Sequence, residues 1–279
     1  MRIVESIPEL RAARSEFETP VGLVPTMGFL HEGHLALVRR ARLECKRVCV
    51  SIFVNPTQFG PQEDLAAYPR DLDGDLELLK TEGTDLVWTP TSETMYPPGF
   101  QSWVTVEDLS QRLEGLHRPG HFRGVTTVVA KLFNAVQPDR AYFGQKDAQQ
   151  VAVIQRMVRD LDFPLQLVVC PTVRETDGLA KSSRNTYLNE RQRQAATVLF
   201  RALTSAVEAF ENGERDAESL RNGMSQVLAS EPLAQEQYVS VADLETLEEL
   251  TGEITQALLS MAVYVGETRL IDNMVARAS

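Results

Sequence analysis

Short apolar runs alternate with amphipathic stretches from about residue 21 to residue 170, and this alternation constrains the fold more than any other feature. The apolar runs predict buried strands at 21–25, 47–54, 85–89, 140–143 and 165–170. Helical periodicity predicts intervening helices at 34–45, 71–82, 125–136 and 147–161. Such alternation is typical of an α/β fold, a parallel sheet with helices on both faces that binds ligands at the carboxyl ends of its strands.

The pattern changes after about residue 175. Two helices are predicted at 189–212 and 216–230, and three strands follow at 238–242, 258–265 and 269–272. This order is typical of a smaller α+β domain. We therefore expect two domains, 1–174 and 175–279, which suits a chain of 279 residues at roughly 100–200 residues per domain.

The net charge of −11 argues against nucleic acid and anionic membranes as partners, because an acidic chain repels phosphate. The first residues lack an apolar signal-peptide region, and no stretch reaches the roughly 18 apolar residues of a membrane span. Cys45, Cys49 and Cys170 are odd in number and form no CxxC motif. These features predict a reduced, cytoplasmic protein.

The strongest functional signal is the sequence PTMGFLHEGH, which lies between a predicted strand and a predicted helix. Free N–H groups and a partial positive charge make a helix start suitable for phosphate, and His31 and His34 can add ring N–H donors there. Glycines at 28 and 33 let the backbone turn tightly. A metal pair is the alternative, but zinc proteases need HExxH, and HEGH has no evident third ligand. The ATP-binding candidates here are Pro25, Thr26, Met27, Gly28, Phe29, Leu30, His31, Glu32, Gly33 and His34.

The sequence DGLAKSSRN at 177–185 is the second signal, because it places two hydroxyl side chains between a lysine and an arginine. Such a string could donate charge-assisted hydrogen bonds to a triphosphate, although alone it is more often a surface loop. Together with the first segment it resembles the two signature loops of the nucleotidyltransferase superfamily, whose members adenylate their substrates.

Two further strand-to-helix turns carry polar residues. The sequence FGQKDAQQ at 143–150 offers Lys146 as a phosphate cation and Asp147 as a helix cap, and a capping role alone would make Asp147 structural. The sequence VNPTQFG follows the second strand. Its Gln58, like Gln150, can hold hydroxyl and carboxylate groups without adding charge, or it can be an ordinary loop residue.

Four segments in this order make the chain resemble the pantothenate synthetase (pantoate–β-alanine ligase) family over residues 3–279: PTMGFLHEGH, VNPTQFGPQEDLAAYPRD, RPGHFRGVTTVVAKLFNAVQPDRAYFGQKDAQQ and DGLAKSSRNTYL. The resemblance implies a Rossmann-like, doubly wound amino-terminal domain, a smaller carboxy-terminal lid and a homodimer. It also implies the reaction, in which pantoate and ATP give pantoyl adenylate and pyrophosphate, and β-alanine then displaces AMP to give pantothenate.

The resemblance also implies roles for individual residues. His34 would be the catalytic histidine, Gln58 and Gln150 would hold pantoate, and Gln58 would also touch β-alanine. Asp75 takes the position of an acidic residue near Mg²⁺, whose other ligands would be mostly phosphate oxygens. Further ATP contacts would come from Gly144, Gln145, Lys146, Asp147, Val173, Lys181, Ser182, Ser183 and Arg184.

Two positions depart from the family pattern, since Lys181 stands where methionine or leucine is expected and Gln145 where glutamate is usual. Lys181 would add a cation beside the nucleotide. Charge considerations assign catalysis to four donors that would stabilise the developing negative charge: His31, His34, Lys146 and Arg184.

Two alternatives stay open. Another adenylating transferase is possible, but one that charges tRNA would need a basic binding module, which the acidic carboxy-terminal part lacks. The second alternative is a regulatory protein that senses nucleotides with an inactive site. The complete set of motifs argues against it, because an inactive site would not retain all of them by chance.

Overall fold

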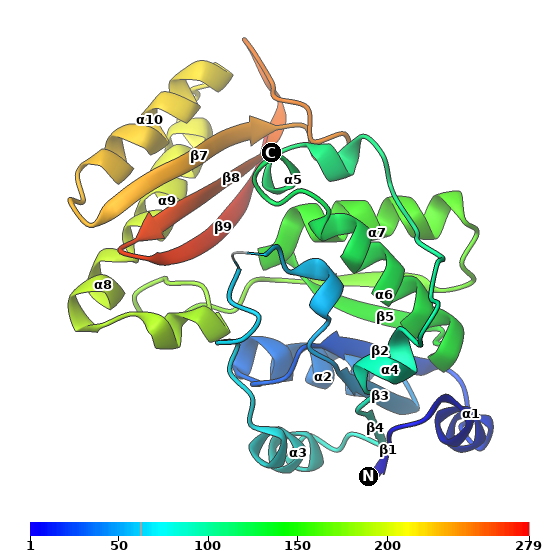
Figure 1. The fold of residues 1–279 in the computed structure, drawn as a ribbon. Coiled ribbons are helices and arrows are strands. Elements are labelled where there is room, and N and C mark those ends of the chain that lie inside the picture. Colours follow the sequence, from blue (N-terminus) through cyan, green and yellow to red (C-terminus); the bar gives the residue numbers. More distant parts are fainter. Residues whose placement is uncertain (62, 279) are drawn as a thin grey trace.

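Six parallel strands form the larger sheet of the computed structural model, which describes residues 1–61 and 63–278 (Figure 1). The strands are β1 (Arg2–Val4), β2 (Val21–Thr26), β3 (Arg47–Ile52), β4 (Leu86–Trp88), β5 (Arg140–Gly144) and β6 (Gln166–Cys170). Their order is β1-β4-β3-β2-β5-β6. The chain therefore proceeds in one direction from β2 through β3 and β4, and in the other through β5 and β6. This reversal places a crevice at the carboxyl ends of β2 and β5, where open α/β sheets bind ligands.

Helices cover both faces of this sheet because its buried strand residues alternate between two apolar clusters. Leu23 packs with α1 (Ile7–Ser15), α6 (His121–Val136) and α7 (Ala148–Asp160). Its neighbour Val24 packs on the other face, with α2 (Glu32–Glu44) and α3 (Leu72–Thr81). Successive strand residues point to opposite faces, so strands apolar on both sides require two helical layers. The remaining short elements are η1 (Pro56–Gln58), α4 (Ser92–Met95), η2 (Leu109–Gln111), α5 (Glu114–His117) and η3 (Gln145–Asp147).

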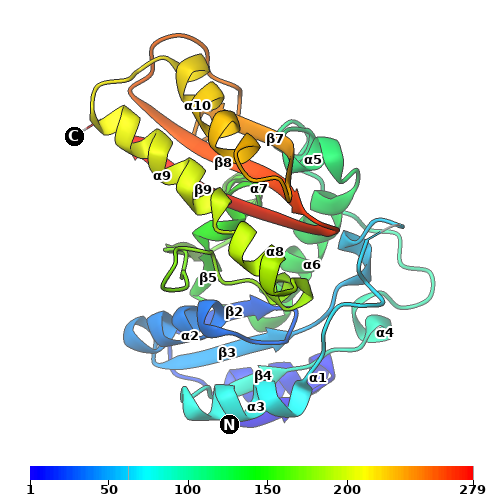
Figure 2. The same cartoon turned by 90° about the vertical axis from the view of Figure 1, so that its left-hand side faces the viewer.

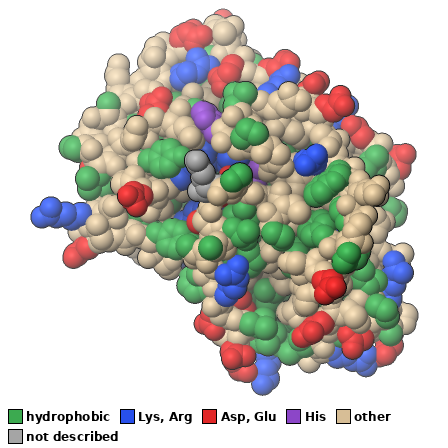
Figure 3. Space-filling model, viewed as in Figure 1, with side chains coloured by type: hydrophobic (Ala, Val, Ile, Leu, Met, Phe, Trp, Pro, Cys, Tyr) green, Lys and Arg blue, Asp and Glu red, His purple; other side chains and the backbone are tan. Residues whose placement is uncertain are grey.

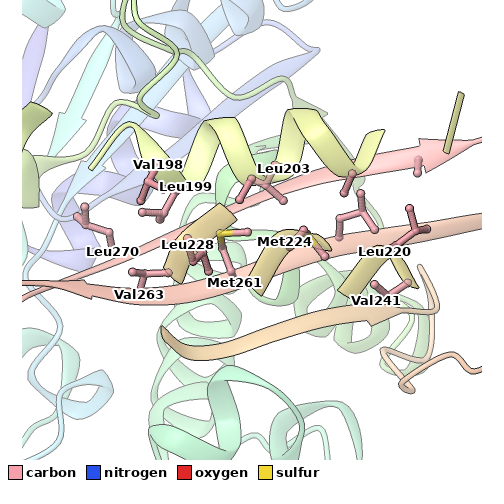
Figure 4. Close-up of a cluster of buried hydrophobic side chains, with 14 of the residues drawn as sticks. Val198, Leu199, Leu203, Leu220, Met224, Leu228, Val241, Met261, Val263 and Leu270 are labelled. Carbon is pink, nitrogen blue, oxygen red and sulfur yellow. The ribbon is translucent and has the colours of Figure 1, made fainter. Parts of the chain in front are cut away.

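The carboxy-terminal part is an antiparallel sheet covered by helices. Its strands, in the order β7-β8-β9, are β7 (Ala234–Ala242), β8 (Gln256–Val265) and β9 (Thr268–Arg277). Its helical elements are η4 (Ser183–Tyr187), α8 (Glu190–Ala195), α9 (Val198–Glu211) and α10 (Ala217–Ala229). Figure 4 shows Leu199 and Leu203 of α9 and Met224 of α10 directed at Met261 and Val263 of β8, within one buried cluster. This separate core confirms the predicted α/β fold with a smaller α+β part.

The structure differs from the sequence prediction in several details. The helix predicted at 189–212 is two helices, because Thr197 donates both its N–H and its hydroxyl to the carbonyl of Gln194, at 3.3 and 2.8 Å, and the chain turns there. The last strand extends over 268–277. Strand β1 and helix α1 were not predicted, and β1 pairs with β4 at the sheet edge.

Polar contacts join the two parts across their interface, and Figures 1 and 2 show the smaller sheet packed beside α5 and α7. Arg269 of β9 forms two hydrogen bonds of 2.7 Å to the buried carboxylate of Glu114 in α5. Arg174 pairs in the same way with Asp272, at 2.6 and 2.9 Å. These bidentate pairs fix the position of β9 over the carboxyl end of the larger sheet.

Candidate active site

A cleft lies at the carboxyl ends of the central strands, between the larger sheet and the segment that follows β6. Residues after β2, β3, β5 and β6 line it, together with one face of α6 and the segment 181–184. Figure 3 shows histidine and basic side chains close together near the middle of one face of the molecule. The predicted crevice and the predicted loops therefore coincide.

The first loop turns sharply into α2 and is held by a buried carboxylate. Gly28 and Phe29 have φ values of +83° and +52°, so two consecutive residues adopt the left-handed conformation. The N–H groups of Phe29 and Leu30 donate to the two carboxylate oxygens of Asp75, at 2.8 and 2.6 Å. Asp75 is 3% exposed and lies outside the cleft lining, where it stabilises the loop.

His31 and His34 form a capping box at the start of α2. The Nδ1 atom of His31 accepts the N–H of Gly33 at 3.1 Å, and the Nδ1 atom of His34 accepts the N–H of His31 at 3.3 Å. The ring centroids lie 4.1 Å apart. When neutral, each ring therefore carries its proton on Nε2.

Both histidines are neutral at physiological pH. Burial, with the charges of Lys146 and Lys181 nearby, lowers the pKa of His31 to about 4. Burial, His31 and Lys146 lower the pKa of His34 to about 3. The site thus offers two fixed N–H donors that need no counter-charge.

The turn after β5 brings Lys146 into the cleft and turns Gln145 away from it. Lys146 lines the cleft, with its Nζ atom 3.7 Å from a carboxylate oxygen of Asp147. Asp147 occupies the N-cap position of α7 but makes no side-chain capping hydrogen bond, so the expected cap is not formed. Gln145 instead donates to the side chain of Asn273 in β9 at 3.2 Å, and Asn273 donates to the carbonyls of Gln145 and Lys146.

The segment 181–184 faces the first loop across the cleft. Ser183 donates its hydroxyl to the carbonyl of Phe29 at 3.4 Å. The Nζ atom of Lys181 lies 2.6 Å from a carboxylate oxygen of Glu175, and Lys181 lines the cleft. Arg184 also lines the cleft and forms a two-point ion pair with Asp64.

Gln58 belongs to a buried amide cluster that includes an unpredicted residue, Asn55. The Nδ2 group of Asn55 donates to Oε1 of Gln58 at 3.0 Å and to the carbonyl of Gly124 at 3.2 Å. Its Oδ1 atom accepts the hydroxyl of Tyr96 at 2.8 Å. Asn55 therefore turns the Nε2 end of Gln58 toward Met27, 3.1 Å from its sulfur. Asn55 lies within the motif VNPTQFG, three residues before Gln58, so the sequence contained the signal for it.

The structure brings most predicted site residues to the cleft and leaves some outside it. The cleft lining includes Pro25, Thr26, Met27, His31, Gly33, His34, Gln58, Gly144, Lys146, Asp147, Gln150, Val173, Lys181, Ser182, Ser183 and Arg184. The candidates outside the lining are Gly28, Phe29, Leu30, Glu32, Asp75 and Gln145. Glu32 instead pairs with Arg39 on the outer surface of α2.

The sequence prediction missed one wall of the cleft. It is formed by Val125, Val128, Val129 and Leu132 of α6, whose periodicity had indicated only core packing. An apolar wall excludes water from the space beside the polar groups.

Arg118 and His121 also line the cleft and had not been assigned a role there. His121 lies with its Nδ1 atom 2.7 Å from the carbonyl of Gln58, and Arg118 pairs with Glu63. Both residues lie in the segment RPGHF, so the motif contained the signal.

A magnesium site made by side chains is not supported within residues 1–61 and 63–278. No group of three or more His, Cys, Asp or Glu side chains there could hold a metal ion. The predicted ligand Asp75 uses both oxygens to accept backbone N–H groups. The described side chains therefore form no cluster that would hold Mg²⁺ by themselves, and a contact of Asp75 with the ion stays a prediction.

Comparisons with known proteins match this chain to one family. The family model described as pantoate-beta-alanine ligase matches residues 2–275. The pantothenate synthetase of Roseiflexus castenholzii is 59% identical over 278 residues and covers 100% of both chains. A crystal structure of pantothenate synthetase from Thermus thermophilus has a TM-score of 0.94 at 50% identity, covering 98% of this chain and 99% of its own.

A further solved structure holds ligands of the reaction. It is the pantoate-beta-alanine ligase of Francisella tularensis, titled as a complex with beta-gamma ATP and beta-alanine. It has a TM-score of 0.81 at 34% identity and covers 99% of this chain and 97% of its own.

Proposed function

The chain belongs to the pantoate–β-alanine ligase family, and we propose that its cleft joins pantoate to β-alanine at the expense of ATP, through a pantoyl-adenylate intermediate. The observation that carries this proposal is the convergence on one cleft of the three loops predicted to bind phosphate, those after β2, β5 and β6. An amide pair suited to a hydroxy acid, Gln58 and Gln150, lines the same cleft.

In the first step, the ionised carboxylate of pantoate attacks the α-phosphate of ATP, an acyl–phosphate bond forms, and pyrophosphate leaves. The attacking group is already charged, so little general-base catalysis is needed. Negative charge grows on the phosphoryl oxygens and on pyrophosphate. We assign its stabilisation to the Nε2–H groups of His31 and His34 and to the cations Lys146 and Arg184, with Lys181 as a further cation.

In the second step, the free amine of β-alanine attacks the acyl carbon, the amide bond forms, and AMP leaves with the bonding electron pair. One proton must leave the nitrogen. Both histidines favour the neutral form, so they act as hydrogen-bond donors in this scheme. The AMP phosphate or solvent takes the proton.

Gln58 and Gln150 are assigned to pantoate, and Gln58 also to β-alanine. Neutral amides can donate to and accept from hydroxyl and carboxylate groups without repelling either substrate. Asn55 orients the Gln58 amide through its 3.0 Å hydrogen bond. The other lining residues of the predicted loops are proposed to surround ATP: Pro25, Thr26, Met27, Gly33, Gly144, Asp147, Val173, Ser182 and Ser183. Gly28, Phe29 and Leu30 would contribute by shaping the first loop.

Magnesium would arrive on the phosphates of ATP, because the described side chains offer no cluster that holds it. When bound it would supply positive charge to the triphosphate. Asp75 contributes by stabilising the loop that carries the histidines.

We propose the division at residues 174 and 175, with residues 175–279 acting as a lid. Support comes from the position of the segment 181–184, which lines the cleft but follows the larger sheet in the chain. Closure of such a lid would protect a mixed anhydride from water. A change in small-angle scattering upon addition of ATP and pantoate would test the movement, and identical curves would contradict it.

A homodimer is proposed as well. The segment 101–106 belongs to no helix or strand and carries Trp103, which is 41% exposed. Arg123 lies over its ring, 4.7 Å from the centroid. Light scattering on purified protein should give twice the chain mass, and a monomer mass would contradict the dimer.

The described helices include none that is long and apolar enough to cross a membrane. The three cysteines are buried free thiols, which supports a cytoplasmic location as a proposal. Fractionation of the native host cells would test it.

Isotope exchange tests the proposed chemistry. With pantoate, ATP and Mg²⁺ alone, the enzyme should exchange labelled pyrophosphate into ATP, because the first step is reversible and needs no amine. Exchange only in the presence of β-alanine would favour a concerted three-substrate reaction. Exchange with another carboxylic acid but not with pantoate would contradict the assigned substrate.

A further inference from the structure

Two consecutive acidic residues each hold an arginine of the cleft. Glu63 accepts from Nε and Nη2 of Arg118, at 2.9 and 2.6 Å. Asp64 accepts from the same two atoms of Arg184, at 3.1 and 2.9 Å. Both arginines line the cleft, one from the segment before α6 and one from the signature loop after β6. Two adjacent acidic side chains therefore pair with two arginines that come from distant segments of the chain.

The pairing leaves one edge of the Arg184 guanidinium for a ligand. Asp64 takes Nε and Nη2, and no hydrogen bond among the described residues uses Nη1. A guanidinium presents its five N–H groups in a rigid fork, so fixing one edge fixes the direction of the other. Nη1 can therefore donate to a phosphate while Asp64 keeps its hydrogen bonds to Nε and Nη2.

We propose that Asp64 is a positioning residue for ATP: it holds Arg184 in the cleft before the nucleotide arrives, so that Nη1 meets the phosphates already oriented. This inference rests on the proposed function of the cleft. It adds Asp64, from the loop after η1, to the nucleotide site. The sequence had predicted ATP contacts only at residues 25–34, 144–147, 173 and 181–184.

The electrostatics of the pair agree with this role. Burial opposes the charge of Arg184, but hydrogen bonds and the charge of Asp64 outweigh it, so the pKa of Arg184 is raised. The same pairing outweighs burial at Asp64 and lowers its pKa. The pair is thus fully charged at neutral pH, and Arg184 need not lose rotamer freedom when ATP binds.

A second contact ties the same loop to η4. The hydroxyl of Tyr187 has two acceptors for its single hydrogen, Asp64 at 3.4 Å and the carbonyl of Ala67 at 3.3 Å. Arg184 and Tyr187 belong to one 3-10 helix, so Asp64 lies beside that helix at two of its residues. Competition is the opposite possibility, in which the carboxylate occupies the guanidinium in place of phosphate, and the two roles predict opposite effects of removing the charge.

Titration calorimetry with ATP distinguishes them. Asp64→Asn should weaken ATP binding by roughly threefold to tenfold, the range expected for ordering one long side chain. Asp64→Glu, which keeps a carboxylate, should recover most of this loss. Asp73→Asn removes the same charge from an exposed position of the neighbouring helix α3 and should leave ATP affinity unchanged. Tighter ATP binding by Asp64→Asn would overturn the proposal in favour of competition.

A double-mutant cycle shows whether Asp64 acts through Arg184. In an Arg184→Ala background, Asp64→Asn should have no further effect on ATP affinity, because the side chain that it orients is gone. Additive losses would overturn the proposal, since Asp64 would then act elsewhere. Pantoate-dependent pyrophosphate exchange by the wild-type enzyme tests the proposed function separately, so failure of one leaves the other assessable.

Discussion

Gly124→Ala should damage the pantoate end of the cleft through a single added methyl group. Gly124 lies in α6 where this helix meets η1, and a Cβ there would stand 2.3 Å from the carbonyl oxygen of Thr57 and 2.7 Å from the nitrogen of Gln58. Real Cβ atoms essentially never approach closer than 3.0 Å, so helix and loop must separate by about 0.7 Å. The contacting atoms belong to the backbone and cannot rotate away.

Two opposing effects set the size of the change in stability. Alanine favours a helix interior over glycine by roughly 1 kcal/mol, while overpacking of this kind costs about 1–3 kcal/mol. The net expectation is a loss of up to about 2 kcal/mol in the free energy of unfolding. The separation also stretches the 3.2 Å hydrogen bond from Asn55 to the Gly124 carbonyl, and Asn55 orients Gln58.

The functional consequence should fall on pantoate. We expect the dissociation constant for pantoate to rise about tenfold, equivalent to ~1.4 kcal/mol, with ATP affinity changed less than twofold. Gly223→Ala is the matched control, because Gly223 lies inside α10 and a Cβ there meets nothing within 4 Å. This control should gain up to about 1 kcal/mol of stability and keep wild-type pantoate affinity.

Urea unfolding measures the free energy of unfolding, and calorimetric titration measures the dissociation constant for pantoate. If Gly124→Ala were as stable as Gly223→Ala and bound pantoate normally, α6 would not press on η1 as described. The assignment of the amide cluster to pantoate would then lose its support.

Three further variants test separate parts of the site. His34→Ala should fold but lose roughly 10²–10³ in the rate of adenylate formation, because one fixed N–H donor disappears; near wild-type single-turnover rates would contradict this role. Gln58→Ala should weaken pantoate binding by about 1–3 kcal/mol and leave ATP affinity nearly unchanged; equal weakening of both in calorimetry would be inconsistent with it. Lys181→Met should weaken ATP binding by roughly 1 kcal/mol at low salt and less at moderate salt, as for a partly screened charge. Glu175→Gln, which frees Lys181, should shift ATP affinity in the opposite direction, and no change in either variant would place Lys181 outside the nucleotide site.

Local patterns predicted most of the larger sheet because its strands are buried on both faces. The strand predicted at 47–54 ends two residues earlier, and the one at 165–170 begins one residue later. Strand β1 escaped prediction because three residues, Arg2–Val4, form too short a run to give periodicity. The break within 189–212 escaped because it depends on hydrogen bonds at Thr197 and not on a helix-breaking residue.

The motifs located the cleft but not the pairings within it. Each motif places its residues at a strand-to-helix turn, and the carboxyl ends of parallel strands meet at one edge, so convergence follows from local sequence. Which carboxylate meets which cation depends on residues far apart, such as Asp64 and Arg184. The loop-stabilising role of Asp75 was hidden for the same reason, since its partners Phe29 and Leu30 lie more than forty positions away.

An acidic chain can hold ATP because the charges of its cleft are balanced locally. The net charge of −11 argues against polyanion binding by a general field, yet Arg184 and Lys181 line the cleft with Asp64 and Glu175 against them. Such pairs hold these half-buried cations in place, while the two neutral histidines of α2 add donors that need no counter-ion. In the proposed site, phosphate recognition would therefore rest on fixed directions of N–H groups more than on excess positive charge. Composition misses this, because it counts charges without regard to their partners.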